Sequence, residues 1–144
     1  MDLLDGLATY LAQLELGVYD PTGQAQAGDW SIFIEHLPDA PDRAIALTLY
    51  TGSAPDGALA YDQPRLQVRV RGTTDPRVSR QRCTAIYGEL HGLCTTTLPD
   101  GTDLETCFAT GTPASMGQDA NRRHEHVVNF DLDVQAPTRW RNTP

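Results

Sequence analysis

The sequence predicts an α+β fold, with an antiparallel or mixed β-sheet of about five strands, two helices packed on one face and a long β-hairpin loop. Some segments have apolar residues three and four positions apart, and others alternate apolar and polar residues, which indicates helices and strands respectively. The order of these segments contains no repeat and is typical of a sheet covered by helices on one face. At 144 residues, the chain has room for one domain over residues 1–144.

The first element is a helix predicted over residues 2–16. Its leucines recur at helical spacing, Asp2 is placed to cap the first turn, and Gly17 is placed to end the helix. Residues 18–29 are rich in Gly, Pro, Asp and Gln, which favours a loop. This loop separates the helix from the sheet.

Three strands are predicted next, because apolar residues alternate with their neighbours. The clearest alternation places Leu66, Val68 and Val70 on one face and arginines on the other. Prolines interrupt the chain between the first two strands. The predicted bounds are 30–35, 44–50 and 65–71.

A second helix is predicted from Pro76 to Gly92, since proline is tolerated in a first turn and glycine favours a helix end. The residues expected on its buried side are Val78, Cys83, Ile86 and Leu90. Alternation then predicts strands over residues 104–110 and 124–135. Between them, residues 111–123 include a single sizeable apolar side chain, Met116, and are predicted to form a long functional or mobile loop.

Charge is distributed unevenly along the chain. The net charge of −8 and the pI near 4.7 disfavour general nucleic-acid binding. Residues 1–63 contain ten acids and one arginine, residues 64–82 contain six arginines and one aspartate, and residues 83–144 contain eight acids and four arginines. This segregation predicts that arginines meet carboxylates, either within the chain or between identical subunits.

Several classes of protein are disfavoured by composition. No segment approaches the roughly 20 apolar residues of a membrane span, and the N-terminal leucines follow aspartates, so neither a span nor a secretory signal is expected. Three cysteines without a CxxC pair favour reduced thiols in a cytosolic setting. The chain has no lysine, which excludes lysine-based catalysis.

The last predicted strand contains two histidines and two aspartates at alternate positions. His124 and His126 could share a strand face and chelate a metal, but the sequence offers no further ligands at a recognisable spacing. Asp131 and Asp133 could hold magnesium, but cross-strand pairing with arginines needs no cofactor. The arginines expected to pair with the aspartates are Arg69 and Arg71.

Motifs of catalysis and of nucleotide binding are missing from the sequence. There is no GxSxG nucleophile elbow and no glycine-rich phosphate loop. The residues therefore predict a protein that is not an enzyme and that uses no cofactor or metal. The alternative drawn from the residues alone is a small acidic metal-dependent enzyme built on the histidines and aspartates of the last strand.

Five strings of residues occur in an order and spacing that resemble one known family. They are Pro41-Asp42-Arg43-Ala44-Ile45-Ala46-Leu47, Tyr50-Thr51-Gly52, Asp62-Gln63-Pro64-Arg65-Leu66-Gln67-Val68-Arg69-Val70-Arg71-Gly72, Ile86-Tyr87-Gly88-Glu89-Leu90-His91-Gly92 and Asn129-Phe130-Asp131-Leu132-Asp133-Val134. Over about residues 2–137 the chain resembles the tail terminator, or minor capsid, proteins of long-tailed bacteriophages.

The resemblance implies a virion structural protein of the tail-neck region, assembled in the host cytoplasm. It implies a ring, generally a homo-hexamer, at the head-proximal end of the tail tube, where the ring stops tube polymerisation and provides the docking face for the head connector. The implied partners are further copies of the chain, the tail tube protein and the head completion or stopper protein. DNA passes through the lumen without specific binding, and no membrane is involved. A head completion or stopper connector protein is the alternative within the structural class.

Two candidate surfaces follow from charge and composition. The candidate subunit interface consists of Arg69, Arg71, Arg77, Arg80, Arg82, Asp131 and Asp133. The candidate tail-tube or connector contact consists of Gly111, Met116, Gln118, Asn121, Arg122 and Arg123. We expect residues 111–123 to be mobile in the free subunit and to order on docking, and the alternative is a surface insertion without a partner.

Overall fold

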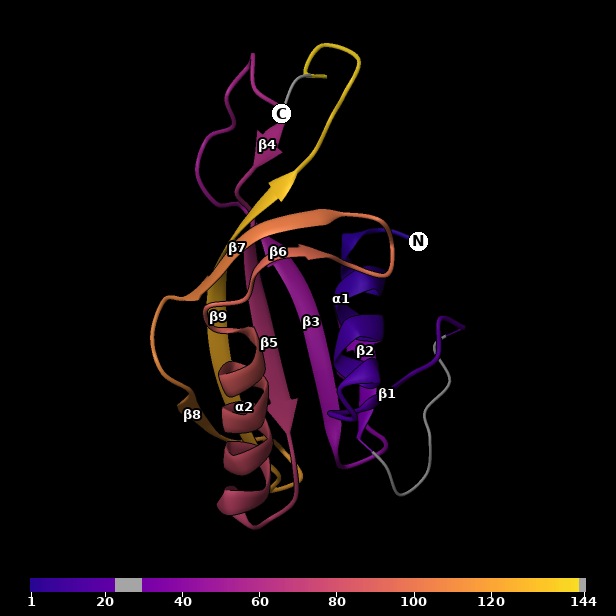
Figure 1. Cartoon of the computed structure of the whole chain (residues 1–144). Helices are drawn as coiled ribbons and strands as arrows, with labels where there is room; N and C mark the ends of the chain where they lie inside the picture. Colours follow the sequence, from indigo (N-terminus) through magenta and orange to yellow (C-terminus); the bar gives the residue numbers. More distant parts are fainter. Residues whose placement is uncertain (23–29, 143–144) are drawn as a thin grey trace.

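The computed structural model describes residues 1–22 and 30–142, and over these it contains two α-helices and a mixed nine-stranded sheet (Figure 1). The helices are α1 (Leu3–Gln13) and α2 (Pro76–Leu90). The strands are β1 (Val18–Tyr19), β2 (Ser31–Ile34), β3 (Ala44–Tyr50), β4 (Tyr61–Asp62), β5 (Arg65–Arg71), β6 (Cys94–Thr97), β7 (Asp103–Ala109), β8 (Ala114–Gln118) and β9 (His124–Gln135). Part of the predicted loop over 18–29, residues 23–29, lies outside the described residues.

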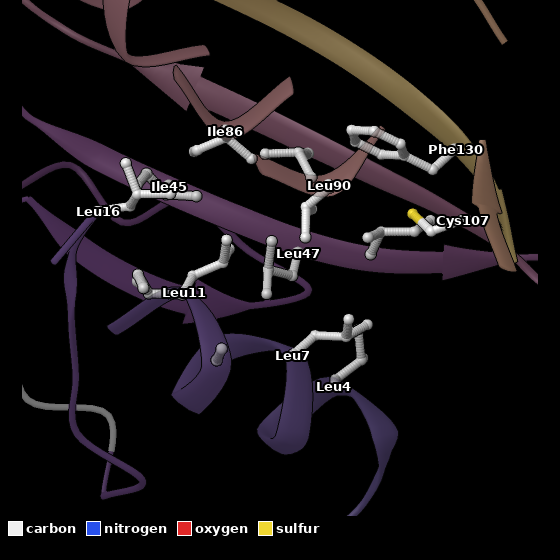
Figure 2. Packing of buried hydrophobic residues seen from close by; sticks show 14 of the residues in the cluster. Leu4, Leu7, Leu11, Leu16, Ile45, Leu47, Ile86, Leu90, Cys107 and Phe130 are labelled. Atoms are coloured by element: carbon white, nitrogen blue, oxygen red, sulfur yellow. The ribbon is translucent and has the colours of Figure 1, made fainter. Parts of the chain in front are cut away.

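The predicted α+β class with both helices on one face is confirmed. Both helices contribute to one cluster of buried residues on the same side of the sheet. Figure 2 shows this cluster, in which residues of α1 and α2 point toward β3, β7 and β9. The labelled members are Leu4, Leu7, Leu11, Leu16, Ile45, Leu47, Ile86, Leu90, Cys107 and Phe130.

The sheet has the order β1-β2-β3-β5-β9-β7-β6. β1, β2 and β3 run parallel to one another, and the other pairs are antiparallel. β9 pairs with β5 and β4 along one edge and with β7 and β8 along the other. With its 12 residues, β9 is about 40 Å long and runs the length of the subunit.

The number of strands predicted, about five, is too low. Strands were predicted where β2, β3, β5, β7 and β9 occur, and the ones missed are β1, β4, β6 and β8. The missed strands have two to five residues, and none of their side chains is fully buried. Backbone pairing with a neighbour holds such strands in place, so they leave no apolar alternation in the sequence.

The first helix begins as predicted but ends earlier. The Asp2 carboxylate accepts a hydrogen bond from the Asp5 N–H at 3.0 Å, and the Asp5 carboxylate accepts one from the Asp2 N–H at 3.0 Å, which forms a reciprocal cap. The helix stops at Gln13 because the chain turns at Glu15, whose φ is 62°. Leu16 then returns to the core.

The second helix packs across β9 and β5, and three of the four residues predicted for its buried side, Cys83, Ile86 and Leu90, are fully buried. The prediction is wrong at Val78. Ser79 is fully buried, whereas Val78 is only half-buried. The Ser79 Oγ lies 2.7 Å from Nδ1 of His126, a buried residue of β9. A hydrogen-bonded polar pair therefore joins α2 to β9 at a position where apolar contact was expected.

The cysteines are thiols, as the sequence predicted. Cys83 and Cys107 are buried, Cys94 is exposed, and all three are free. Burial raises the pKa of the Cys83 and Cys107 thiols to about 12, so both stay protonated at neutral pH. Within the described part of the chain, no helix is long and apolar enough to cross a membrane.

The Ser79–His126 pair predicts a specific pH dependence of stability. Burial lowers the pKa of His126, and the charges of Arg80 and His124 lower it further. The unfolded state therefore takes up the proton first, and stability falls as the pH drops through the ordinary histidine value of about 6.5. Urea unfolding at pH 7.5 and 5.5 should show a larger loss for the wild type than for His126→Gln. An equal loss in both proteins would contradict this assignment.

Candidate functional site

The candidate contact segment, residues 111–123, is largely a β-hairpin rather than a loop. β8 pairs antiparallel with the first residues of β9, and the prediction of a loop is wrong for residues 114–118. The signal was missed because all five side chains of β8 are exposed. The Asp119 carboxylate closes the turn by accepting hydrogen bonds from the Asn121 and Arg123 N–H groups, both at 2.9 Å. The turn and β8 form the hairpin end of the subunit.

Five of the six residues predicted for this contact lie on the surface. The exposed ones are Gly111, Met116, Gln118, Asn121 and Arg122. Met116 is 49% exposed, which makes it the main apolar side chain of the hairpin end. Arg123 is instead buried, and its guanidinium donates to the Asp119 carboxylate at 2.9 Å and to the Asp42 carboxylate. Arg123 therefore anchors the hairpin turn to its own subunit.

Arg71 has a similar anchoring position on the sheet face opposite the helices. It is 3% exposed and donates hydrogen bonds to the carbonyl oxygens of Pro38, Pro41 and Asp42. Burial lowers the pKa of Arg71, and the nearby Arg123 charge lowers it further. The two arginines together hold the segment between β2 and β3 against the sheet. Arg71 was predicted to pair with an aspartate of the last strand, because sequence patterning does not reveal which loops fold back over a strand.

The exposed arginines of β5 meet carboxylates of β9, as the charge pattern predicted. Arg65 Nε lies 3.0 Å from the Asp131 carboxylate, and Arg69 bonds to Glu125. The partners differ from the expected ones, because the strand register sets Arg65, not Arg69 or Arg71, opposite Asp131. These cross-strand pairs satisfy the charges within one subunit.

The arginines of α2 differ in their surroundings. Arg77 pairs with Asp75 at the N-terminus of the helix at 3.0 Å. Arg82 donates to the Leu16 carbonyl oxygen at 3.2 Å and lies 5.1 Å from the centre of the Trp30 ring. Arg80 is exposed and makes no hydrogen bond or ion pair with the rest of the described chain. Its charge acts on two groups nearby, because it lowers the pKa of Asp75 and the pKa of His126.

Two adjoining hollows of about 290 and 330 Å³ lie where the Arg82 side chain reaches toward α1. Trp30 and Arg82 belong to the walls of both. The remaining wall residues are aliphatic or polar, with Glu15 the one acid, and they place no nucleophile beside a base.

The histidines and aspartates of β9 do not converge on one point. His126 faces α2, whereas Asp131 is exposed on the other face and pairs with Arg65. Asp133 is half-buried, and its Oδ1 has no hydrogen-bond partner in the described residues. Burial raises the pKa of Asp133, and the charge of Glu105 raises it further. Across residues 1–22 and 30–142, no three His, Cys, Asp or Glu residues are grouped to hold a metal ion.

The comparisons with known proteins agree with an assembly role. A family model described as bacteriophage tail terminator protein matches residues 10–136, a span that includes the last residues of α1, all of α2 and the whole sheet. A search of curated proteins found no match. Because the family model covers most of the chain, the protein belongs to the bacteriophage tail terminator family, whose members are virion structural proteins.

Proposed function

We propose that the protein forms a ring at the head-proximal end of the phage tail tube, in the tail-neck region of the virion. There it stops tube polymerisation and provides the docking face for the head connector. The match to the tail terminator family over residues 10–136 is the observation that carries this proposal. The ring is a homo-hexamer assembled in the host cytoplasm, and its partners are the tail tube protein and the head completion or stopper protein.

The acidic character of the chain supports passage of DNA through the lumen without specific binding. Each subunit has a formal net charge of −8. A ring of such subunits repels the phosphate backbone, so DNA slides past without adhering. The family match favours this role over that of a head completion protein, which was the alternative within the structural class.

Ring formation is proposed to use opposite charges on the two sides of the helical face. α1 lies over β1, β2 and β3, and α2 lies over β5, β7 and β9. Asp2 and Glu15 lie just outside the two ends of α1, and Asp5 lies in its first turn. Arg80, which makes no ion pair within the described chain, lies on α2. A head-to-tail contact between the α2 side of one subunit and the α1 side of the next closes a ring of identical interfaces.

Other members of the candidate interface are less available. Arg71, Arg82 and Asp133 are partly or fully buried in their own subunit. Arg69, Arg77 and Asp131 are already paired within the chain. Arg80 is therefore the member whose charge a neighbouring subunit is proposed to satisfy.

Reversing the charge of Arg80 tests this interface. Arg80→Glu should weaken ring formation and reduce its sensitivity to salt, because the attraction to acidic side chains of the neighbour becomes repulsion. Native mass spectrometry and light scattering across a salt series measure the effect. Arg122→Glu, the same change at an exposed arginine of the hairpin end, is the matched control and should leave the ring intact. Equal ring formation by the Arg80→Glu variant and the wild type would rule out this contact.

The hairpin end is proposed to contact the tail tube or the connector. Met116 supplies an exposed apolar group on β8, and Arg122 supplies an exposed charge on the turn. The structure gives residues 114–118 a strand conformation, so the hairpin is preformed along β8 rather than assembled entirely on docking. A preformed strand lowers the conformational entropy lost on binding.

Substitutions test the hairpin better than a deletion, since removing residues 113–120 would remove Asp119 and release Arg123. The double variant Met116→Asp, Arg122→Glu should fold and form rings but should terminate tails poorly. Overlong tubes, seen by electron microscopy of particles made with this variant, are the expected result. The conservative pair Met116→Leu, Arg122→Lys should support normal tails. Tails of normal length with the double variant would mean that the hairpin is a surface insertion.

A further inference from the structure

We propose that the subunit has a second docking element at the opposite end of β9, with Trp140 as its anchor. This element, the distal arm, consists of residues 52–62 and 136–142. The distal arm docks into an apolar socket that has a carboxylate at its rim. This socket belongs to a protein that stacks on the ring, on the opposite face from the one that the hairpin end contacts. The inference rests on the proposed ring and adds the residues and the chemistry of its second contact.

The position of the distal arm follows from the pairing of β9. The hairpin turn lies just before the first residue of β9, and β4 pairs with its last residues at Val134 and Gln135. The two ends are separated by the length of the strand, about 40 Å for 12 residues. Figure 1 shows β4, the loop before it and the C-terminal segment projecting beyond the sheet at one end, while β8 lies toward the other.

The distal arm is held by one arginine rather than by an apolar core. Arg141 donates to the carbonyl oxygens of Leu59 and Tyr61, at 2.8 and 2.6 Å, and to the Asp62 carboxylate at 2.9 Å. Its side chain is 13% exposed, so these bonds are largely shielded from solvent. The Ala136 N–H donates to the Ala60 carbonyl oxygen at 2.7 Å. These bonds tie the C-terminal segment to the loop before β4 and to β4 itself.

The turn that Arg141 closes presents an indole to solvent. The backbone groups of Thr138 and Arg141 bond to each other, which sets Arg139 and Trp140 at the tip. Trp140 is 80% exposed, and Leu59 nearby on the arm is 48% exposed. Tryptophan and arginine are frequent among the residues that dominate binding energy at protein interfaces. Fixing the anchor beforehand lowers the entropy cost of binding.

Arg139 indicates the chemistry of the partner. Its guanidinium lies 4.8 Å from the centre of the Trp140 ring, and it makes no ion pair with any other described residue. A partner that receives the indole therefore meets this cation at the same time, and a carboxylate beside the socket would neutralise it. A protein surface supplies both groups. Duplex DNA is disfavoured because the subunit has a net charge of −8.

The location favours a stacked partner over a neighbour in the ring. The charges proposed for the ring contact lie along the flanks of the helical face, whereas the distal arm lies at the end of β9. The hairpin end and the distal arm also differ in chemistry, one with Met116 among polar groups and the other with an aromatic anchor. Two chemically different ends suit a ring that meets two different proteins.

The test uses full-length rings with purified tail tubes and purified heads from the same phage. Trp140→Ala is compared with the conservative Trp140→Phe and with the hairpin variant Met116→Asp, Arg122→Glu. Cosedimentation and electron microscopy score the ring, its junction with tubes and its junction with heads. Trp140→Ala should form rings but should lose at least about tenfold in affinity at one junction, as expected for an interface anchor. Trp140→Phe should retain that junction, and the hairpin variant should lose the other.

Several outcomes would overturn the inference. One is that Trp140→Ala binds at both junctions with normal affinity. Another is that Trp140→Ala and the hairpin variant lose the same junction. A third is that Trp140→Ala fails to form rings. Wild-type rings that bind neither tubes nor heads would overturn the proposed function and the inference together. Wild-type rings that bind both, with Trp140→Ala unchanged, would overturn the inference alone.

A direct measurement follows the indole itself. Rings labelled with 5-hydroxytryptophan can be excited apart from the tryptophans of the partner. Acrylamide should strongly quench the fluorescence of Trp140 in the isolated ring, and should quench it much less after the docking partner is added. The Trp140→Phe variant lacks this fluorescence and gives the background from the buried Trp30. Protection by duplex DNA alone, or by neither tubes nor heads, would contradict the inference.

Discussion

The pairing of β9 with four other strands is the constraint on which the rest of the structure depends. Its two edges receive β5 and β4 on one side and β7 and β8 on the other, so every element that projects from the body is attached to this strand. One face of β9 is apolar at alternate positions and lies under α2. The same strand therefore organises the core and sets the separation of the two ends of the subunit.

Arginines organise much of the sheet face opposite the helices, next to the buried Phe33, Ala44 and Ala46. Arg71 and Arg123 are buried and bond to the segment between β2 and β3, while Arg65 and Arg69 pair with carboxylates of β9. The planar guanidinium can satisfy several backbone carbonyl groups at once, which lets it hold a loop against the sheet. Arg141 holds the distal arm in the same way.

Several groups stand exposed on the surface of the subunit. They include the Arg80 side chain on α2, strand β8 of the hairpin end and the indole of Trp140. Aromatic residues and arginine are enriched where proteins contact one another. Membership of the tail terminator family gives these surfaces their proposed partners.

The sequence by itself determined those elements whose apolar residues recur at a regular spacing. The two helices and the strands β2, β3, β5, β7 and β9 were predicted because their apolar residues recur at helical or alternate spacing, and the family resemblance over residues 2–137 is confirmed by the match over residues 10–136. The paired charges of β5 and β9 were also expected, although the register chose Arg65 as the partner of Asp131.

Tertiary structure alone decided the features that depend on contacts between distant segments. β8 exists because β9 offers it backbone partners, and its exposed side chains leave no periodic signal. Arg71 and Arg123 became anchors because the chain between β2 and β3 folds back over them. Ser79 replaced Val78 in the core because His126 lies across from it. The local pattern of a sequence shows which side of an element is apolar. Which distant residue becomes the hydrogen-bond partner of a polar side chain is determined only when the elements pack against each other.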